Sequence, residues 1–356
     1  MLEALARISS GQRLSPTDEQ NALNELEWNE CWQPLFRYLD QALAAGTQNQ
    51  PAHYRRLIRL RLNYFEDYAT AQALTSDMIR RCRLDFAGFR DALLNDQVIP
   101  GIEARQEAAL LEAASDAFHA RADRAQALEK LAVVYEKRLF NESRLQQVFE
   151  RLLELDPDNI RALRYFKLAF SQNNDWEQVA RILKRLINVV QARQEKFRLA
   201  HDLAYNLVYH MEQPRDALLI LDRYCKESPL DVSQIEFDAA YRIGDMDRCI
   251  QVLRGALLGV RDDAGKAIIQ FRMAELFRTM GNLRDCESSL RQSLDTWSVF
   301  LDPFEALIQL QMDDKRWKDV CGSLRSLAGR VQDPELVAQI QQAASRIASG
   351  LGDQGP

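Results

Sequence analysis

Four histidines and six cysteines are the side chains in this sequence best suited to catalysis or metal binding. The most closely spaced histidines, His201 and His210, are nine residues apart, whereas a metal-binding pair on one helix needs a separation of four. The cysteines form no CxxC pair, and Cys249 and Cys286 occupy equivalent places in a helical pattern. We therefore expect reduced packing cysteines, no metal and no cofactor.

Sequence motifs that seat a nucleophile or a phosphate are also missing. The chain has no GxSxG, GxGxxG or GxxxxGK[ST] segment, so neither an activated serine nor a glycine-rich phosphate loop is indicated. We therefore interpret the protein as non-catalytic.

The strongest charge feature is RRLIRLRL at 55–62. One interpretation is that Arg55, Arg56 and Arg59 bind an acidic protein segment or RNA, together with the basic residues that continue to position 83. The alternative is a basic helix that packs through the apolar stripe Leu57, Leu60 and Tyr64. The net charge of −6 and the pI near 5.5 disfavour nucleic acid as a partner.

Composition predicts long helices with short connections. The 356 residues include only 14 Gly and 10 Pro, too few for the frequent turns of a sheet protein. We find no uninterrupted apolar run of about 18 residues and no apolar core of signal-peptide length near the N-terminus. We expect a cytoplasmic protein without membrane insertion, and the preference for Arg over Lys is typical of a GC-rich bacterial genome.

A repeated phrase then organises the chain: a turn, an apolar residue, a small or medium residue three positions on, and an apolar residue four beyond that. Clear copies are DWEQV (175–179), GDMDRC (244–249) and GNLRDC (281–286). The medium residues align as Leu35, Ala71, Leu145, Val179, Ala217, Cys249, Cys286 and Val320. These span 285 residues, or eight steps of about 36, with an unmarked unit expected near Ala108.

This pattern resembles the tetratricopeptide repeat family, whose unit is two antiparallel helices of which the second often ends at a proline such as Pro157 or Pro229. The resemblance is strongest over 145–320 and implies an all-α, right-handed α-solenoid of about nine hairpins. We expect degenerate hairpins over 1–120, clearer repeats with a C-terminal capping helix over 121–348, and a disordered tail at 349–356. Trp32, Trp176 and Trp317 fall at equivalent positions and are predicted to lie in hairpin cores.

Local signals support helix boundaries. Ser15 followed by Pro16 is typical of a helix start, and Pro34 and Pro214 suit the first turns of second helices. The segment VIPG at 98–101 should separate two helices.

In this family the first helix of each unit lines a binding groove. The corresponding residues are Arg164, Leu168, Ser171 and Gln172; Asp202, Asn206, Tyr209 and His210; Gln234, Asp238, Tyr241 and Arg242; Phe271, Glu275, Arg278 and Thr279. Tyr209, Tyr241, Arg242 and Arg278 are the candidate anchors, because Tyr and Arg dominate interface energetics.

Arg164 and Asn206 also suit the family's clamp for a peptide carboxylate, but Gln234 and Asp238 occupy its basic positions. A carboxylate at 238 repels such a ligand, so binding of chaperone tails is disfavoured. The resemblance implies a scaffold or adaptor that binds a protein or peptide in the groove. The alternatives are a structural or regulatory subunit of a larger bacterial machine for motility, secretion or defence, and an RNA-associated repeat protein.

Overall fold

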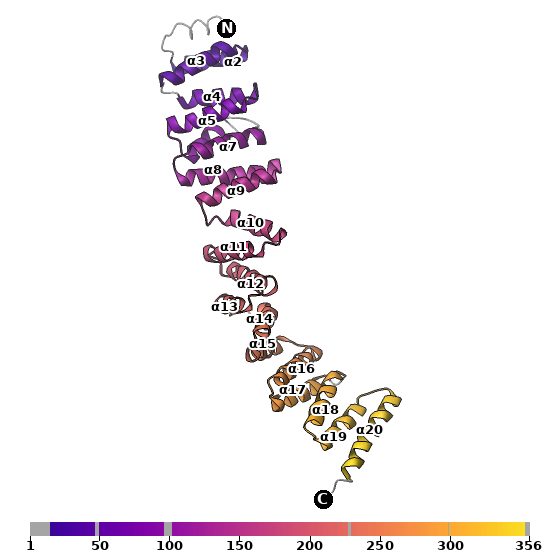
Figure 1. Ribbon diagram of the computed structural model, residues 1–356. Coiled ribbons are helices and arrows are strands. Elements are labelled where there is room, and N and C mark those ends of the chain that lie inside the picture. The colour runs from indigo at the N-terminus through magenta and orange to yellow at the C-terminus, as the bar shows by residue number, and fades with distance from the viewer. Residues whose placement is uncertain (1–14, 47–49, 96–101, 227–228, 298, 353–356) are drawn as a thin grey trace. The chain divides into compact units, whose positions relative to one another are not determined.

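The computed structural model describes residues 15–46, 50–95, 102–226, 229–297 and 299–352. Within these ranges the chain has nineteen α-helices, one π-helical segment and no strand (Figure 1). The predicted all-α class is confirmed.

The structure forms two compact units, residues 1–165 and 166–356. The first contains α2 (Pro16–Trp28), α3 (Trp32–Ala45), α4 (Gln50–Asn63), α5 (Tyr68–Cys82), α6 (Phe86–Leu93), α7 (Ala104–Ala117), α8 (Arg121–Val134), the π-helical η1 (Tyr135–Leu139) and α9 (Glu142–Leu155). Helix α10 (Ile160–Gln172) spans the division. The second unit continues with α11 (Trp176–Val189), α12 (Arg193–Tyr209), α13 (Pro214–Tyr224), α14 (Pro229–Ile243), α15 (Met246–Gly259), α16 (Asp263–Thr279), α17 (Leu283–Thr296), α18 (Asp302–Asp313), α19 (Trp317–Ala328) and α20 (Pro334–Gly352).

These boundaries differ from the domain division expected from the sequence. The units meet at residue 165, whereas the repeat pattern placed a change in regularity at 120. Helix α20 also continues through the first four residues of the expected tail, and 353–356 lie outside the described residues, as does the 98–101 interruption.

The eight residues aligned from the sequence are structurally equivalent. Each is the fourth residue of the second helix of its hairpin, and each is at most 7% exposed. The unmarked unit consists of α6 and α7, with Ala108 buried as the fifth residue of α7. Helices α2 to α19 therefore follow one another along the sequence as nine helix pairs. The α6–α7 pair is irregular, because α7 packs on α5 and α8, whereas the short α6 contacts α8 and α4. Helix α20 packs on α19.

The turn inside a hairpin has the same geometry in the eight units that have an aligned residue. Five positions before each aligned residue, the backbone adopts the left-handed conformation, with φ between 50° and 78°. These residues are Glu30, Glu66, Phe140, Asn174, Glu212, Gly244, Gly281 and Lys315. In five of these eight turns the side chain of the following residue caps the second helix; Asp175, for example, accepts a hydrogen bond from the backbone N–H of Gln178 (3.2 Å). The backbone N–H of Asp175 donates a hydrogen bond to the carbonyl of Phe170, so a carbonyl at the end of the first helix also has a partner.

Helix α11 illustrates why these segments are helical and buried. Val179, Ile182, Leu183, Leu186 and Ile187 recur at spacings of three and four and form one buried face. Neighbouring hairpins bury such faces against each other; in the second unit one core cluster joins residues from α14 to α18.

The three aligned tryptophans are not in the hairpin cores, so that prediction was wrong. Trp32, Trp176 and Trp317 each begin a second helix and are only half-buried, because the first residue of that helix lies at the edge of the hairpin next to the turn. Tyr64 likewise falls after the end of α4 and is 59% exposed, so it does not belong to the packed stripe of Leu57 and Leu60.

The expected capping at the first described helix is confirmed. Ser15 accepts a hydrogen bond from the backbone N–H of Asp18 (3.2 Å), and Pro16 is the first helical residue. None of the described helices has both the length and the hydropathy needed to cross a bilayer.

Candidate functional site

A pocket of about 350 Å³ lies between α11, α12 and the C-terminal half of α10. It brings together side chains from two adjacent first helices and the start of the second helix between them. Its lining residues are Lys167, Ser171, Trp176, Val179, Leu183, His201, Asp202, Tyr205, Asn206 and His210. We call it the Asn206 pocket.

Asn206 is the polar side chain with the clearest unused capacity in this pocket. It is 3% exposed, and its Nδ2 donates a hydrogen bond to the backbone carbonyl of Trp176 (2.9 Å). That hydrogen bond determines which amide atom is Nδ2, because in the flipped orientation Oδ1 would face the carbonyl oxygen of Trp176. Among the described residues the buried Oδ1 then has no hydrogen-bond partner, so it can accept one from an N–H or O–H of a ligand.

Aromatic rings form another part of the pocket. Trp176 stacks on His210 with ring centroids 3.8 Å apart and an angle of 8°. Tyr205 is 47% exposed and lies 5.8 Å from the His210 ring and 4.6 Å from the Tyr209 ring. Beside them Lys167 pairs with Asp202 (3.2 Å), so the pocket combines apolar faces with a neutralised ion pair.

Three predicted groove residues meet between α12 and α14, next to this pocket. The Tyr209 hydroxyl donates to Asp238, Arg242 donates to the carbonyl of Val208 (2.5 Å), and the Arg242 guanidinium lies 5.5 Å from the Tyr209 ring. Burial, followed by the hydrogen bond to Asp238, raises the pKa of Tyr209 to about 12. These contacts join the first helices of adjacent hairpins. Tyr209 and Arg242, which the sequence predicted as anchors for a partner, therefore stabilise the packing of the two hairpins.

The other predicted anchors remain more open. Tyr241 is 54% exposed and stacks on Phe237 with ring centroids 6.1 Å apart. Arg278 of α16 pairs with Asp313 of α18 (3.6 Å). Arg164 is exposed but belongs to the first unit, whereas the residues above belong to the second.

The arginines of α4 are held within the fold. Arg59 pairs with Glu27 of α2 (2.5 Å), and Arg56 is 8% exposed and bonded to Asn24 and Glu27. Arg55 is half-buried and donates to the carbonyl of Pro51 (3.3 Å). Because α2 supplies their counter-charges, Arg56 and Arg59 join two hairpins and are poorly placed to bind an acidic segment.

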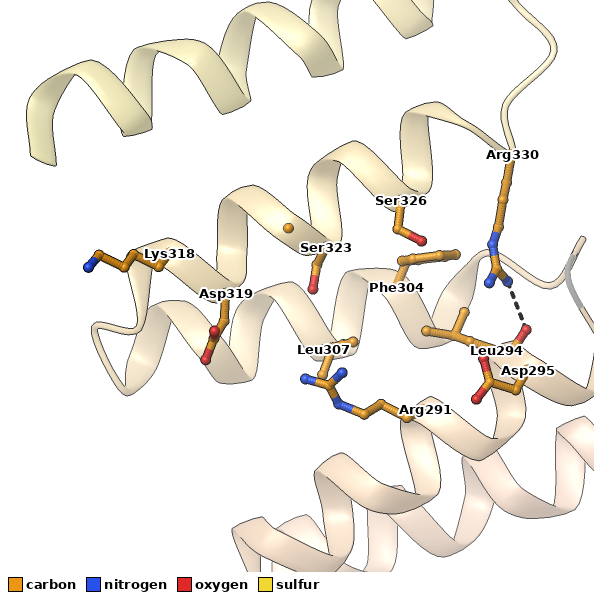
Figure 2. Close-up of a pocket in the computed structure, with 11 residues that line it drawn as sticks. Arg291, Leu294, Asp295, Phe304, Leu307, Lys318, Asp319, Ser323, Ser326 and Arg330 are labelled. Carbon is orange, nitrogen blue, oxygen red and sulfur yellow. Dashed lines mark hydrogen bonds between the residues drawn. The ribbon is translucent and has the colours of Figure 1, made fainter.

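A second pocket, of about 320 Å³, lies between α17, α18 and α19 (Figure 2). Phe304 and Leu307 of α18 lie below Ser323 and Ser326 of α19, and Arg330 donates to the carbonyl of Leu294 (2.7 Å). Arg330 also lies 5.1 Å from the Phe304 ring.

The charged groups of the second pocket do not converge on one ligand charge. Arg291 is paired with Glu287 (2.8 Å), and Asp319 is paired with Arg316 (3.3 Å). Lys318 points away from the pocket in Figure 2. The pocket is therefore a weaker candidate than the Asn206 pocket, where a buried acceptor lacks a partner.

The sequence identified Asn206, Asp202, Ser171 and His210 as groove positions but did not foresee the contribution of Trp176 and Tyr205. A usable signal existed for Tyr205. It occupies the position midway along the first helix where the family favours Gly or Ala, and a ring at a point of close helix approach must turn outward. Trp176 could not be placed without knowing that its ring stacks on His210.

Groups that could hold a metal ion are absent from the described residues, where no cluster of three or more His, Cys, Asp or Glu is found. The described cysteines are unpaired, and burial raises the pKa of Cys225 and of Cys249 to about 11. Such thiols are protonated at neutral pH, as suits packing residues.

The sequence matches no protein-family model and no curated protein. Solved structures do show similarity. The tetratricopeptide repeat protein YrrB, described as having an unusual peptide-binding site, is 16% identical, with 51% of this chain and 91% of that chain covered and a TM-score of 0.35. A tetratricopeptide repeat protein from Parabacteroides merdae is 11% identical (68% and 92% covered, TM-score 0.31), and yeast Tom70 is 11% identical (95% and 89% covered, TM-score 0.30). The similarity concerns the fold of helical hairpins alone.

Proposed function

We propose that the protein is a non-catalytic scaffold that binds an extended segment of a partner protein across the first helices of its second unit. The observation that carries this proposal is Asn206, whose buried Oδ1 lacks a partner inside a pocket with exposed aromatic rings. A buried acceptor without a partner is unfavourable by about 1–3 kcal/mol, so a ligand that donates to it recovers that free energy.

An extended peptide fits these groups for a chemical reason. Its backbone N–H supplies the donor that Asn206 lacks, and its side chain covers the Trp176–His210 stack and Tyr205. Tyr241 on the next first helix extends the aromatic contact beyond the pocket. Arg242 and Asp238 hold Tyr209 in place, so they position this surface more than they bind.

Selection from a phage-displayed library of random dodecapeptides tests the proposal. Enriched peptides should bind the full chain, and Asn206→Ala should weaken them about 3- to 10-fold, as expected for one lost hydrogen bond. Tyr205→Ala should weaken them to a similar degree. Gln251→Ala, which removes an exposed amide from α15, is the matched control and should leave affinity unchanged.

Thermal unfolding of each variant separates lost binding from lost folding, since Asn206 also bonds the Trp176 carbonyl. Peptides that bind the Asn206→Ala and Tyr205→Ala proteins as tightly as the original would place the binding surface elsewhere. Failure to enrich any peptide would remove the scaffold function at this site.

A further inference from the structure

The first two hairpins expose aromatic rings next to their turns, at the opposite end of the sequence from the second unit. We call this surface the turn-edge patch. It consists of Trp28, Glu30, Trp32, Tyr64, Phe65 and Glu66. Because Trp28, Glu30 and Trp32 surround the α2–α3 turn, and Tyr64, Phe65 and Glu66 precede α5, the patch joins two equivalent turns.

Ring contacts connect the two hairpins across the patch. The Trp32 ring lies 5.0 Å from Tyr64 and 5.6 Å from Phe65. Trp28 is 88% exposed and Tyr64 is 59% exposed, although burying a large aromatic ring contributes more favourable free energy than burying a smaller side chain. Trp32, Tyr64 and Phe65 thus form one cluster of rings, and exposed rings that lie together are typical of a binding surface.

The charge of the patch is negative and uncompensated. Glu30 and Glu66 occupy the left-handed position of their turns, are exposed, and form no ion pair with the described residues. The acidic side chain that follows, Asp67, is already paired with Arg61 (3.5 Å). The patch therefore presents two free carboxylates beside aromatic faces.

Immediately beside the patch, the fold itself shows which group suits this combination. The guanidinium of Arg61 lies 4.4 Å from the centre of the Phe36 ring and 5.9 Å from that of Phe65, while it pairs with Asp67. A cation held between aromatic faces and a carboxylate gains from both the ring quadrupole and the ion pair.

We propose that the turn-edge patch binds an arginine-containing segment of a partner protein, with guanidinium groups on the exposed rings and paired to Glu30 and Glu66. Planar guanidinium groups stack on rings and bind carboxylates with two N–H donors, so arginine suits the patch better than lysine. Anionic partners such as RNA or acidic peptides are repelled by the same carboxylates. This interaction lies in the first unit and is independent of the Asn206 pocket.

Titration calorimetry with a blocked peptide of alternating glycine and arginine tests the proposal on the full chain. The double variant Glu30→Gln and Glu66→Gln should weaken binding about 5- to 20-fold, and Trp28→Ala about 2- to 5-fold. Affinity should fall as salt rises, and a glycine–lysine peptide should bind more weakly.

Two variants provide matched controls. Glu212→Gln alters an exposed glutamate at the same left-handed turn position in the second unit, and Phe140→Ala removes a ring that is 81% exposed. Both should retain full affinity, as should Asn206→Ala. The proposal is overturned if the arginine peptide does not bind, or if it binds the Glu30, Glu66 and Trp28 variants as tightly as it binds the controls.

Discussion

Replacing glycine by alanine at two kinds of position in the second unit should change stability in opposite directions. Gly244 ends the α14–α15 turn with φ of 78°, whereas Gly322 lies inside α19. A Cβ built at either position meets nothing within 4 Å. The two substitutions therefore differ in backbone conformation and not in packing.

The expected magnitudes follow from that difference. A Cβ in the left-handed region is unfavourable by about 1–2 kcal/mol, and the reduced freedom of the unfolded chain returns about 0.4–1 kcal/mol. Gly244→Ala should therefore destabilise the protein by about 1 kcal/mol. Gly322→Ala should stabilise it by about 0.8–1 kcal/mol, because alanine is the better helix former.

Urea unfolding followed by circular dichroism measures both changes, and hydrogen exchange at the α14–α15 turn and in α19 locates them, since hairpin stacks can open locally. Gly281→Ala, at a residue with φ of 73°, should destabilise the protein as Gly244→Ala does. Gly255→Ala, inside α15, should stabilise it as Gly322→Ala does. If Gly244→Ala and Gly322→Ala shift the free energy of unfolding in the same direction, the shared left-handed turn does not control hairpin stability.

Three further changes test the scaffold. Tyr209→Phe should destabilise the protein by about 1 kcal/mol, because it removes the hydrogen bond to Asp238. In the original protein, tyrosinate absorbance should show a midpoint near pH 12 that is absent from the variant. Because the pKa of Tyr209 is raised on folding, its contribution to the free energy of unfolding is complete below pH 10 and is lost as the pH rises through 12. Arg248→Met should cost about 1–2 kcal/mol in urea unfolding, less at high salt, because Arg248 bridges Asp222 (2.8 Å) and Glu236 (2.7 Å). Trp176→Ala should lower the free energy of unfolding by about 2 kcal/mol, less than the roughly 3–5 kcal/mol typical of a fully buried ring, and a larger loss in calorimetry would contradict its half-buried position.

The helical repeat could be predicted from the sequence because its signal is local and recurs. The eight aligned residues from Leu35 to Val320 are all buried at the same place in a hairpin. The double step of 74 residues from Ala71 to Leu145 predicted an extra unit, and α6 and α7 lie in that interval. What the sequence could not show is which polar groups find partners. Asp238 and Arg242 looked like free groove residues, yet both contact residues of α12 across the helix interface.

The arginines of α4 show the same difficulty. RRLIRLRL reads as a basic surface because the counter-charge, Glu27, lies on another helix about 30 positions earlier. Conversely, the free acceptor of Asn206 becomes visible only when the carbonyl of Trp176 is placed beside its Nδ2. Pairing between side chains far apart in sequence is set by tertiary packing, which periodicity does not encode.

The uniform spacing from the left-handed turn residue to the buried fourth residue has a consequence for how such a chain can change in length. Successive units are 32 to 38 residues apart, yet this interval is five in all eight units that have an aligned residue, so their variation lies in the links between hairpins and at the far ends of the helices. A whole hairpin can therefore be inserted or removed as a unit, with the boundaries of the change in the links between hairpins. Duplications or deletions that begin and end at such links, for example at Gln191, would preserve every turn, and engineered arrays of different length can be cut there.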